Sequence, residues 1–190
     1  MNRRTVIRRH PERAVPGEAA AILAAGSVAH VGFVEDGQPY VIPLLYHFEP
    51  ERPDRLWLHG SRGSRIQRHL RRGAPVCVSV AVVDGLVASK DAQFHSANYR
   101  SVVAFGRARP VPEEEKPAVF EQMTRRYFAG RAVDVDYAAP TPNELLATSV
   151  LEVEIEAWSA KARRGGPTGP RDDDPDAPGS AGVFDPPPAA

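Results

Sequence analysis

The sequence contains a single cysteine, Cys77, among its 190 residues. A lone cysteine has no intrachain partner, which excludes an internal disulfide framework and favours a reducing compartment. The sequence also lacks an apolar stretch of roughly 20 residues, the length that a membrane-spanning helix needs. No apolar region follows the arginine-rich N-terminus, so a secretion signal is not indicated. We therefore expect a soluble, cytoplasmic protein with no membrane partner.

The chain has no excess charge of either sign, because 24 basic residues balance 24 acidic residues. Without a global field, there is no general attraction to a polyanion, and nucleic acid is not an expected partner. The six histidines include no His-x-x-x-His pair and have no cysteine beside them. This spacing predicts no metal site. Walker, Rossmann and nucleophile-elbow motifs are also missing, which argues against triphosphate, dinucleotide and Ser-His-Asp chemistry.

The composition is that of one globular domain, since 42% of the residues are hydrophobic in a chain of 20.7 kDa. The C-terminal region is different, being rich in Gly, Pro and Asp, and buries too little apolar surface to offset chain entropy. We predict a flexible N-terminal arm over residues 1–15, a folded domain over 16–164 and a disordered tail over 165–190.

Short β-rich runs joined by turns dominate the predicted domain. Asp36-Gly37 separates two such runs and is a strong hairpin signal, and Asp84-Gly85 is interpreted as a second hairpin turn. We expect strands at 28–34, 40–48, 55–59, 76–83, 86–89, 102–111 and 150–158, and helices at 18–25, 64–72 and 112–127. Antiparallel strands with few helices favour a closed or nearly closed β-barrel.

The sharpest local feature is the segment His59-Gly60-Ser61-Arg62-Gly63-Ser64-Arg65. It follows a strand and opens a helix, so backbone N–H groups, two hydroxyls and two guanidinium groups can converge on one anion. The alternative is a tight turn in which Ser64 only caps the helix and the arginines are solvated. The segment on its own does not decide between a phosphate site and a turn.

Two further polar clusters flank predicted strands. Ser89-Lys90, followed by the segment 94–101, lies between two strands and either lines a pocket or forms a loop. The basic segment 161–164 follows the last strand, where it is either solvated or contacts an anion.

Taken in order, these segments resemble the pyridoxamine 5′-phosphate oxidase-like superfamily, and most closely its nitroimidazole-reductase-type branch. The resemblance runs through Val31-Gly32-Phe33, Gly37 to Leu44, Leu56 to Ser61, Gly73 to Val78, Asn98 to Val103 and Phe105 to Ala108. It implies a mainly β fold, an antiparallel six-stranded Greek-key split β-barrel with a few flanking helices. It also implies a homodimer with FMN bound at the subunit interface.

The resemblance also assigns site residues. The strand Pro43 to Tyr46 would offer backbone groups to the isoalloxazine edge, and the His59 turn would hold the ribityl phosphate. The implied cofactor-binding residues are Pro43, Leu44, Tyr46, His59, Ser61, Ser64, Arg65, Asn98, Tyr99, Arg100, Ser101, Lys161 and Arg163. The Arg-Leu-His-Asp-Arg-like substrate segment of true pyridoxamine phosphate oxidases is absent, which argues against vitamin B6 oxidation.

The functional expectation is an FMN-dependent oxidoreductase acting on a small electrophile, nitroreductase-like or oxidase-like, in which the flavin performs the electron transfer. His59 is the candidate proton donor near the ring, because imidazole titrates near neutrality. The alternatives are a flavin-binding protein without turnover, a deazaflavin protein, and a haem protein with His30, His47, His59 or His95 as axial ligand.

Overall fold

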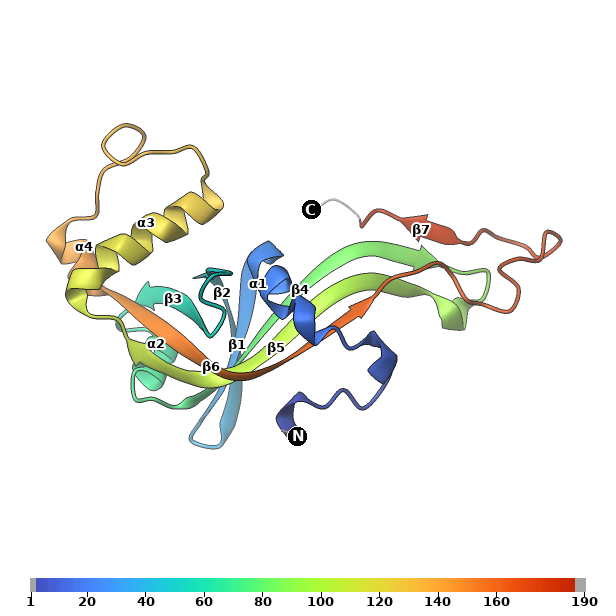
Figure 1. The fold of residues 1–190 in the computed structure, drawn as a ribbon, viewed down its shortest axis with the longest axis horizontal. Helices are drawn as coiled ribbons and strands as arrows, with labels where there is room; N and C mark the ends of the chain where they lie inside the picture. Colours follow the sequence, from blue (N-terminus) through green and yellow to red (C-terminus); the bar gives the residue numbers. More distant parts are fainter. Residues whose placement is uncertain (1–2, 187–190) are drawn as a thin grey trace.

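The protein forms one antiparallel sheet that closes on itself (Figure 1). The structure is a computed structural model and describes residues 3–186. The strands are β1 (Val28–Glu35), β2 (Gln38–His47), β3 (Arg55–Ser61), β4 (Pro75–Ala88), β5 (Ser96–Pro110), β6 (Thr148–Arg163) and β7 (Gly182–Phe184). Their order is β1-β2-β3-β6-β5-β4-β7, and an additional β1–β4 pairing closes the first six into a ring. This arrangement confirms the predicted six-stranded antiparallel split barrel.

The ring is nearly open between β2 and β3. These strands pair only at Tyr46 with Leu58 and at His47 with Trp57. By contrast, β1 pairs with β2 along its whole length, from Val28 to Glu35. Residues 38–45 of β2 therefore have a strand partner on one side only, within the part of the chain that the structure describes.

Helices lie at the ends and on the outside of the ring. The α-helices are α1 (Ala19–Ala25), α2 (Arg65–Leu70), α3 (Lys116–Tyr127) and α4 (Pro142–Ala147), and short 3₁₀ turns occupy Arg3–Thr5, Pro11–Arg13, Pro16–Glu18, Ala92–Phe94 and Glu113–Glu115. The first three helices confirm the sequence prediction. The fourth was not predicted, although Thr141 and Glu144 form a capping box at its start.

The barrel interior holds the main core, in which residues from every second strand position pack with Ile22 and Leu23 of α1. A second, smaller core lies outside the barrel. There Val119 and Met123 of α3 pack on Trp57 of β3 and Val150 of β6. This second core fixes α3 over the end of β3, beside the turn that precedes α2.

The Asp84-Gly85 pair is not a hairpin turn, as the sequence had predicted. β4 continues through it as one strand, with a register shift between Val83 and Gly85 opposite β5. Gly85 lies against β7, and a Cβ there would lie 3.1 Å from Val183 and 3.2 Å from the Phe184 carbonyl oxygen. The glycine therefore makes room for a neighbouring strand within a β-bulge.

The long strands β4, β5 and β6 extend beyond the ring as an arm, on the right in Figure 1, and the C-terminal segment returns along it. This segment differs from the expected disorder. Its strand β7 pairs with Leu86 to Ala88, and the Asp172 carboxylate accepts hydrogen bonds from the Ser89 hydroxyl at 2.8 Å and the Lys90 N–H at 2.7 Å. Specific hydrogen bonds thus replace the apolar burial that the composition lacks.

The N-terminal arm also makes specific contacts. Arg4 pairs with Glu156 at 3.1 Å, the Lys161 ammonium donates to the Arg9 carbonyl at 3.0 Å, and Ala14 forms an isolated bridge with Lys161. These contacts place the arm along β6. The boundaries proposed from the sequence, at residues 15 and 164, stay predictions.

Candidate functional site

Ser64 occupies the N-cap position of α2, but its side chain makes no capping hydrogen bond. Its hydroxyl is buried and has no partner among the described residues. A serine that capped the helix would accept a hydrogen bond from a backbone N–H in the first turn. The alternative in which Ser64 serves only as a helix cap is therefore not supported by the geometry.

Partnerless buried polar atoms gather around this turn. They are the Nδ1 of His59, the Nε of Arg62, the Oγ of Ser64 and both amide atoms of Gln67; among the described residues only the Nδ1 of His47 joins them. A buried polar group without a hydrogen bond costs about 1–3 kcal/mol. A concentration of such groups in nine residues is what a polar ligand or ordered water would satisfy.

The arginines of the turn already contact acidic side chains. Arg65 donates to the Glu35 carboxylate at 2.9 Å and to the Tyr40 hydroxyl at 2.7 Å, and its guanidinium lies 4.4 Å from the centre of the Tyr40 ring. Arg62 donates to Glu113 at 2.5 Å. A phosphate at this turn would therefore share these two cations with existing carboxylates.

His59 lies on β3 one residue before the glycine of the turn. Burial lowers the pKa of its imidazole, and its ring meets the edge of Phe120 of α3 at 5.9 Å between centroids. The ring is therefore neutral at physiological pH, with one nitrogen free to donate or accept a proton or to bind a ligand.

The β2 residues implied as isoalloxazine contacts differ in whether their backbone groups are free to bind a ligand. Tyr46 is fully buried, its hydroxyl donates to the Leu23 carbonyl at 2.5 Å, and the Tyr127 hydroxyl takes up both its backbone N–H and its carbonyl. Burial also raises the pKa of Tyr46 to about 12. Tyr46 thus has a structural role here, and its backbone groups are not available. Pro43 and Leu44 pair with β1 and lie in the stretch of β2 that has no strand on its other side, and their assignment as flavin contacts stays a prediction.

The implied interface residues lie on the arm, away from the turn (Figure 1). Tyr99 and Ser101 of β5 face Arg163 and Lys161 of β6 across the register. Ala108, which faces β3 across β6, lies nine positions along β5 from Tyr99, and this is roughly 30 Å of extended chain. One copy of the chain therefore does not bring the two predicted groups together.

The arm residues are also engaged within the chain. Arg163 donates to the Asn98 side chain at 2.6 Å, and Arg100 forms a two-pronged contact with Asp84 at 2.7 and 2.8 Å. The Arg100 guanidinium lowers the pKa of the Asp84 carboxyl. An anion bound at the arm would compete with Asp84 for Arg100, whereas Arg163 has only neutral acceptors around it.

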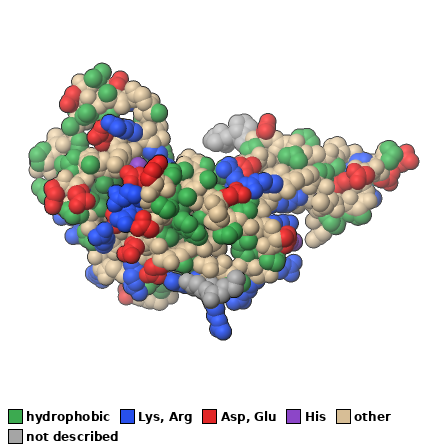
Figure 2. Space-filling model, in the orientation of Figure 1, with side chains coloured by type: hydrophobic (Ala, Val, Ile, Leu, Met, Phe, Trp, Pro, Cys, Tyr) green, Lys and Arg blue, Asp and Glu red, His purple; other side chains and the backbone are tan. Residues whose placement is uncertain are grey.

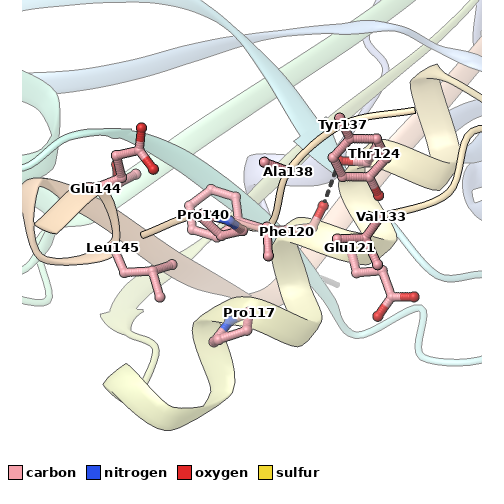
Figure 3. Close-up of a pocket in the computed structure, with 12 residues that line it drawn as sticks. Pro117, Phe120, Glu121, Thr124, Val133, Tyr137, Ala138, Pro140, Glu144 and Leu145 are labelled. Carbon is pink, nitrogen blue, oxygen red and sulfur yellow. Dashed lines mark hydrogen bonds between the residues drawn. The ribbon is translucent and has the colours of Figure 1, made fainter. Parts of the chain in front are cut away.

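A cavity of about 500 Å³ adjoins the turn and was not predicted from the sequence. It lies between α3, α4 and the loop that connects them, and Figure 3 shows its lining side chains. We call it the α3–α4 cavity; its walls include Phe120, Thr124, Tyr137, Pro140, Leu145 and Thr148. Because these residues come from separate segments, no single sequence motif reveals the cavity.

The other proposed haem ligands differ in their surroundings. His47 is buried, its ring is tilted against the Trp57 ring, and it contacts Glu49 at 3.2 Å. Burial lowers its pKa, while Glu49 acts in the opposite direction. His30 and His95 are exposed. Among residues 3–186, no group of three or more His, Cys, Asp or Glu side chains could hold a metal ion.

The surface in Figure 2 carries basic and acidic side chains interspersed with hydrophobic ones, as expected for a chain without net charge. None of the helices within residues 3–186 is long and apolar enough to cross a membrane.

Comparisons with known proteins agree with this architecture. The model of the pyridoxamine 5′-phosphate oxidase family matches residues 16–162. The FAD and heme binding protein from Mycobacterium smegmatis is 32% identical, with a TM-score of 0.79 over 90% of this chain and 83% of that one. The flavocytochrome Anf3 from Azotobacter vinelandii is 30% identical, with a TM-score of 0.80 over 96% of this chain and 84% of that one.

More distant structures share the fold alone. A putative 5-nitroimidazole antibiotic resistance protein from Bacteroides thetaiotaomicron is 19% identical, with a TM-score of 0.62 over 78% of this chain and 86% of that one. No curated protein matches the chain.

Proposed function

Because the chain belongs to the pyridoxamine 5′-phosphate oxidase family, we propose that it is a flavin-dependent oxidoreductase whose cofactor phosphate binds at the β3–α2 turn. The observation that carries this proposal is the buried, partnerless hydroxyl of Ser64, accompanied by the orphan nitrogen atoms of His59 and Arg62. A flavin phosphate supplies acceptor oxygens for such groups. The residues present therefore fit the phosphate end of a flavin.

The proposed site includes two copies of the chain. The turn and the arm cannot meet within one copy, whereas a second copy could bring its arm to the turn. The outward face of β1 and β2 supports this arrangement, because Val34 and Val41 are 58% and 66% exposed. Exposed apolar patches on a soluble protein commonly mark interaction surfaces. A partner would also cover the unpaired side of β2, where a flavin ring needs a second wall.

The bound flavin would supply electron or hydride transfer to a small electrophile. The chain would orient it: the β3–α2 turn anchors the phosphate, and residues 43–45 of β2 offer backbone groups. His59 lies on β3, where burial lowers the pKa of its imidazole, and it would donate or accept a proton.

The absorption spectrum of the purified protein, with FMN and FAD added separately, tests this function. We expect a yellow protein with about one flavin per chain, and faster oxidation of a nicotinamide donor with a quinone or nitroaromatic than free flavin gives. Binding without such turnover would reduce the function to flavin binding. No binding of either flavin would contradict it.

A haem is the second candidate cofactor, because two relatives at 30% identity or more are a flavocytochrome and an FAD and heme binding protein. His59 is the candidate axial ligand, since its Nδ1 is buried and partnerless, whereas the ring of His47 already contacts Glu49. A Soret band in the purified protein that disappears in His59→Ala supports this assignment. A Soret band unchanged in that variant rejects His59 as the ligand.

A further inference from the structure

The α3–α4 cavity has the size of a small-molecule site, and its lining side chains suit an uncharged, planar group. Its volume of about 500 Å³ falls within the range of ligand pockets, about 300–1,000 Å³. Phe120 and Tyr137 contribute aromatic rings, and Pro117 and Pro140 contribute flat apolar surfaces (Figure 3). Stacking on such surfaces favours a planar aromatic ligand.

The charged groups of the lining define the ligand further. The charged side chains that line the cavity are Glu121 and Glu144, which lie on opposite sides of the group in Figure 3. Glu121 pairs with Arg125 at 2.6 Å, and the Glu144 carboxylate accepts from the Thr141 N–H at 2.7 Å. Carboxylates at the walls disfavour an anion and suit a base that carries amino hydrogens.

The cavity is adjacent to the proposed phosphate site. Thr148 lines the cavity and pairs with Ser61 of the turn. The Arg62 N–H donates to the Ala147 carbonyl at 3.0 Å, which ties the turn to the end of α4. A group joined to a phosphate at the turn is therefore next to the cavity.

We propose that the α3–α4 cavity binds the adenine of FAD, with the diphosphate at the β3–α2 turn joining adenine to the flavin. This inference rests on the proposed flavin function and adds the form of the cofactor: the chain selects FAD over FMN because its cavity receives the part that FMN lacks. NADH carries the same adenine and diphosphate, so it is the competing source of this chemistry.

Tyr137→Ala tests the proposal, with Val135→Ala as the matched control. Both residues lie in the α3–α4 loop, but Tyr137 lines the cavity and Val135 is 83% exposed and does not. We expect the wild-type protein to bind FAD more tightly than FMN. Tyr137→Ala should weaken FAD by about tenfold, in the range of base–aromatic stacking, and leave FMN unchanged; Val135→Ala should change neither.

Flavin titrations with FMN, FAD and NADH separate the outcomes. Equal affinity for FAD and FMN, or an equal loss of both in Tyr137→Ala, would overturn the adenine assignment while leaving the flavin function in place. Binding of NADH that depends on Tyr137, without a preference for FAD, would assign the cavity to the reductant instead. A Soret band lowered by Tyr137→Ala would assign it to haem. Failure to bind any flavin would overturn both proposals.

Discussion

Ser64 combines an N-cap position with a buried hydroxyl that caps nothing. Ser64→Ala should therefore not lower the free energy of unfolding of the cofactor-free protein, and should raise it by up to about 1–3 kcal/mol, because it removes a buried polar group without a partner. Its flavin affinity should fall by about tenfold or more, because a hydrogen bond to a charged phosphate contributes roughly 1.5–3 kcal/mol. Urea unfolding and flavin titration measure the two quantities.

Thr141→Ala is the control, because the Thr141 side chain does accept a hydrogen bond from the Glu144 N–H. It should lose about 1 kcal/mol of stability, as a true cap does, without weakening FMN. If Ser64→Ala lost as much stability as Thr141→Ala, the hydroxyl would be a structural group and the ligand interpretation would be wrong.

His59 should make the stability of the cofactor-free protein depend on pH. Burial lowers the pKa of the folded imidazole, so below the unfolded value of about 6.5 the unfolded state binds more protons. The free energy of unfolding therefore falls as pH drops from about 6.5 towards the folded pKa. His59→Phe should make this fall smaller.

Urea midpoints at about pH 7.5 and about pH 5.5 provide the comparison, on either side of the unfolded pKa. His95→Phe, at an exposed histidine, should leave the fall unchanged. An equal fall in wild type and His59→Phe would show that His59 is not the titrating group.

At the scale of elements, the register between β5 and β6 depends on Gly106. A Cβ at this position would lie 1.9 Å from the Glu154 backbone oxygen, at the register shift between Phe105 and Gly106. Because a backbone atom cannot rotate away, Gly106→Ala should cost at least about 3 kcal/mol, the upper range of overpacking. Gly17→Ala, with nothing within 4 Å, should cost far less. Equal urea midpoints for the two variants would contradict the observed β5–β6 register.

Local signals predicted some elements and not others. Asp36-Gly37 adopts positive φ at both residues, so the hairpin between β1 and β2 follows from its own sequence. Asp84-Gly85 is the same dipeptide, but pairing of β4 with β5 and β7 holds the chain in a continuous strand. Long-range pairing overrides a turn signal, and a sequence pattern contains no information about which strands will be neighbours.

For the candidate site too, the sequence predicted the part that depends on neighbouring residues and missed the parts that depend on long-range contacts. The β3–α2 turn could be predicted because its glycines, hydroxyls and arginines are adjacent in sequence. The structural role of Tyr46 could not, because Leu23 and Tyr127, which occupy its polar groups, are 23 and 81 residues away. The α3–α4 cavity was missed for the same reason: its walls meet only after α3 has packed on Trp57 and Val150.

At the scale of the whole molecule, the proposed site combines the turn of one copy of the chain with the arm of a second copy, and so predicts a dimer. A dimer has a mass of 41.4 kDa, twice the 20.7 kDa of the chain. Val41→Glu places a charge on the exposed face of β2 and should shift the mass measured by light scattering towards one chain, because an unpaired charge in an interface is costly.

Val135→Glu, at an exposed position of the α3–α4 loop, should leave the mass unchanged. Flavin affinity should fall together with dimerisation in Val41→Glu. A monomeric variant that retained full flavin affinity would show that one chain holds the cofactor alone.

The measurement that most directly tests the phosphate site compares FMN with riboflavin, which lacks the phosphate, in wild type, Arg65→Ala and Arg68→Ala. Arg65 lies at the start of α2, with its guanidinium on Glu35 and Tyr40, whereas Arg68, one turn further along the helix, donates to the Gly63 carbonyl of the β3–α2 turn. A charge-assisted hydrogen bond contributes roughly 1.5–3 kcal/mol, so Arg65→Ala should weaken FMN by about tenfold or more. Riboflavin affinity should stay the same, and Arg68→Ala should have a smaller effect. Equal losses for FMN and riboflavin in Arg65→Ala would contradict a phosphate site at the β3–α2 turn.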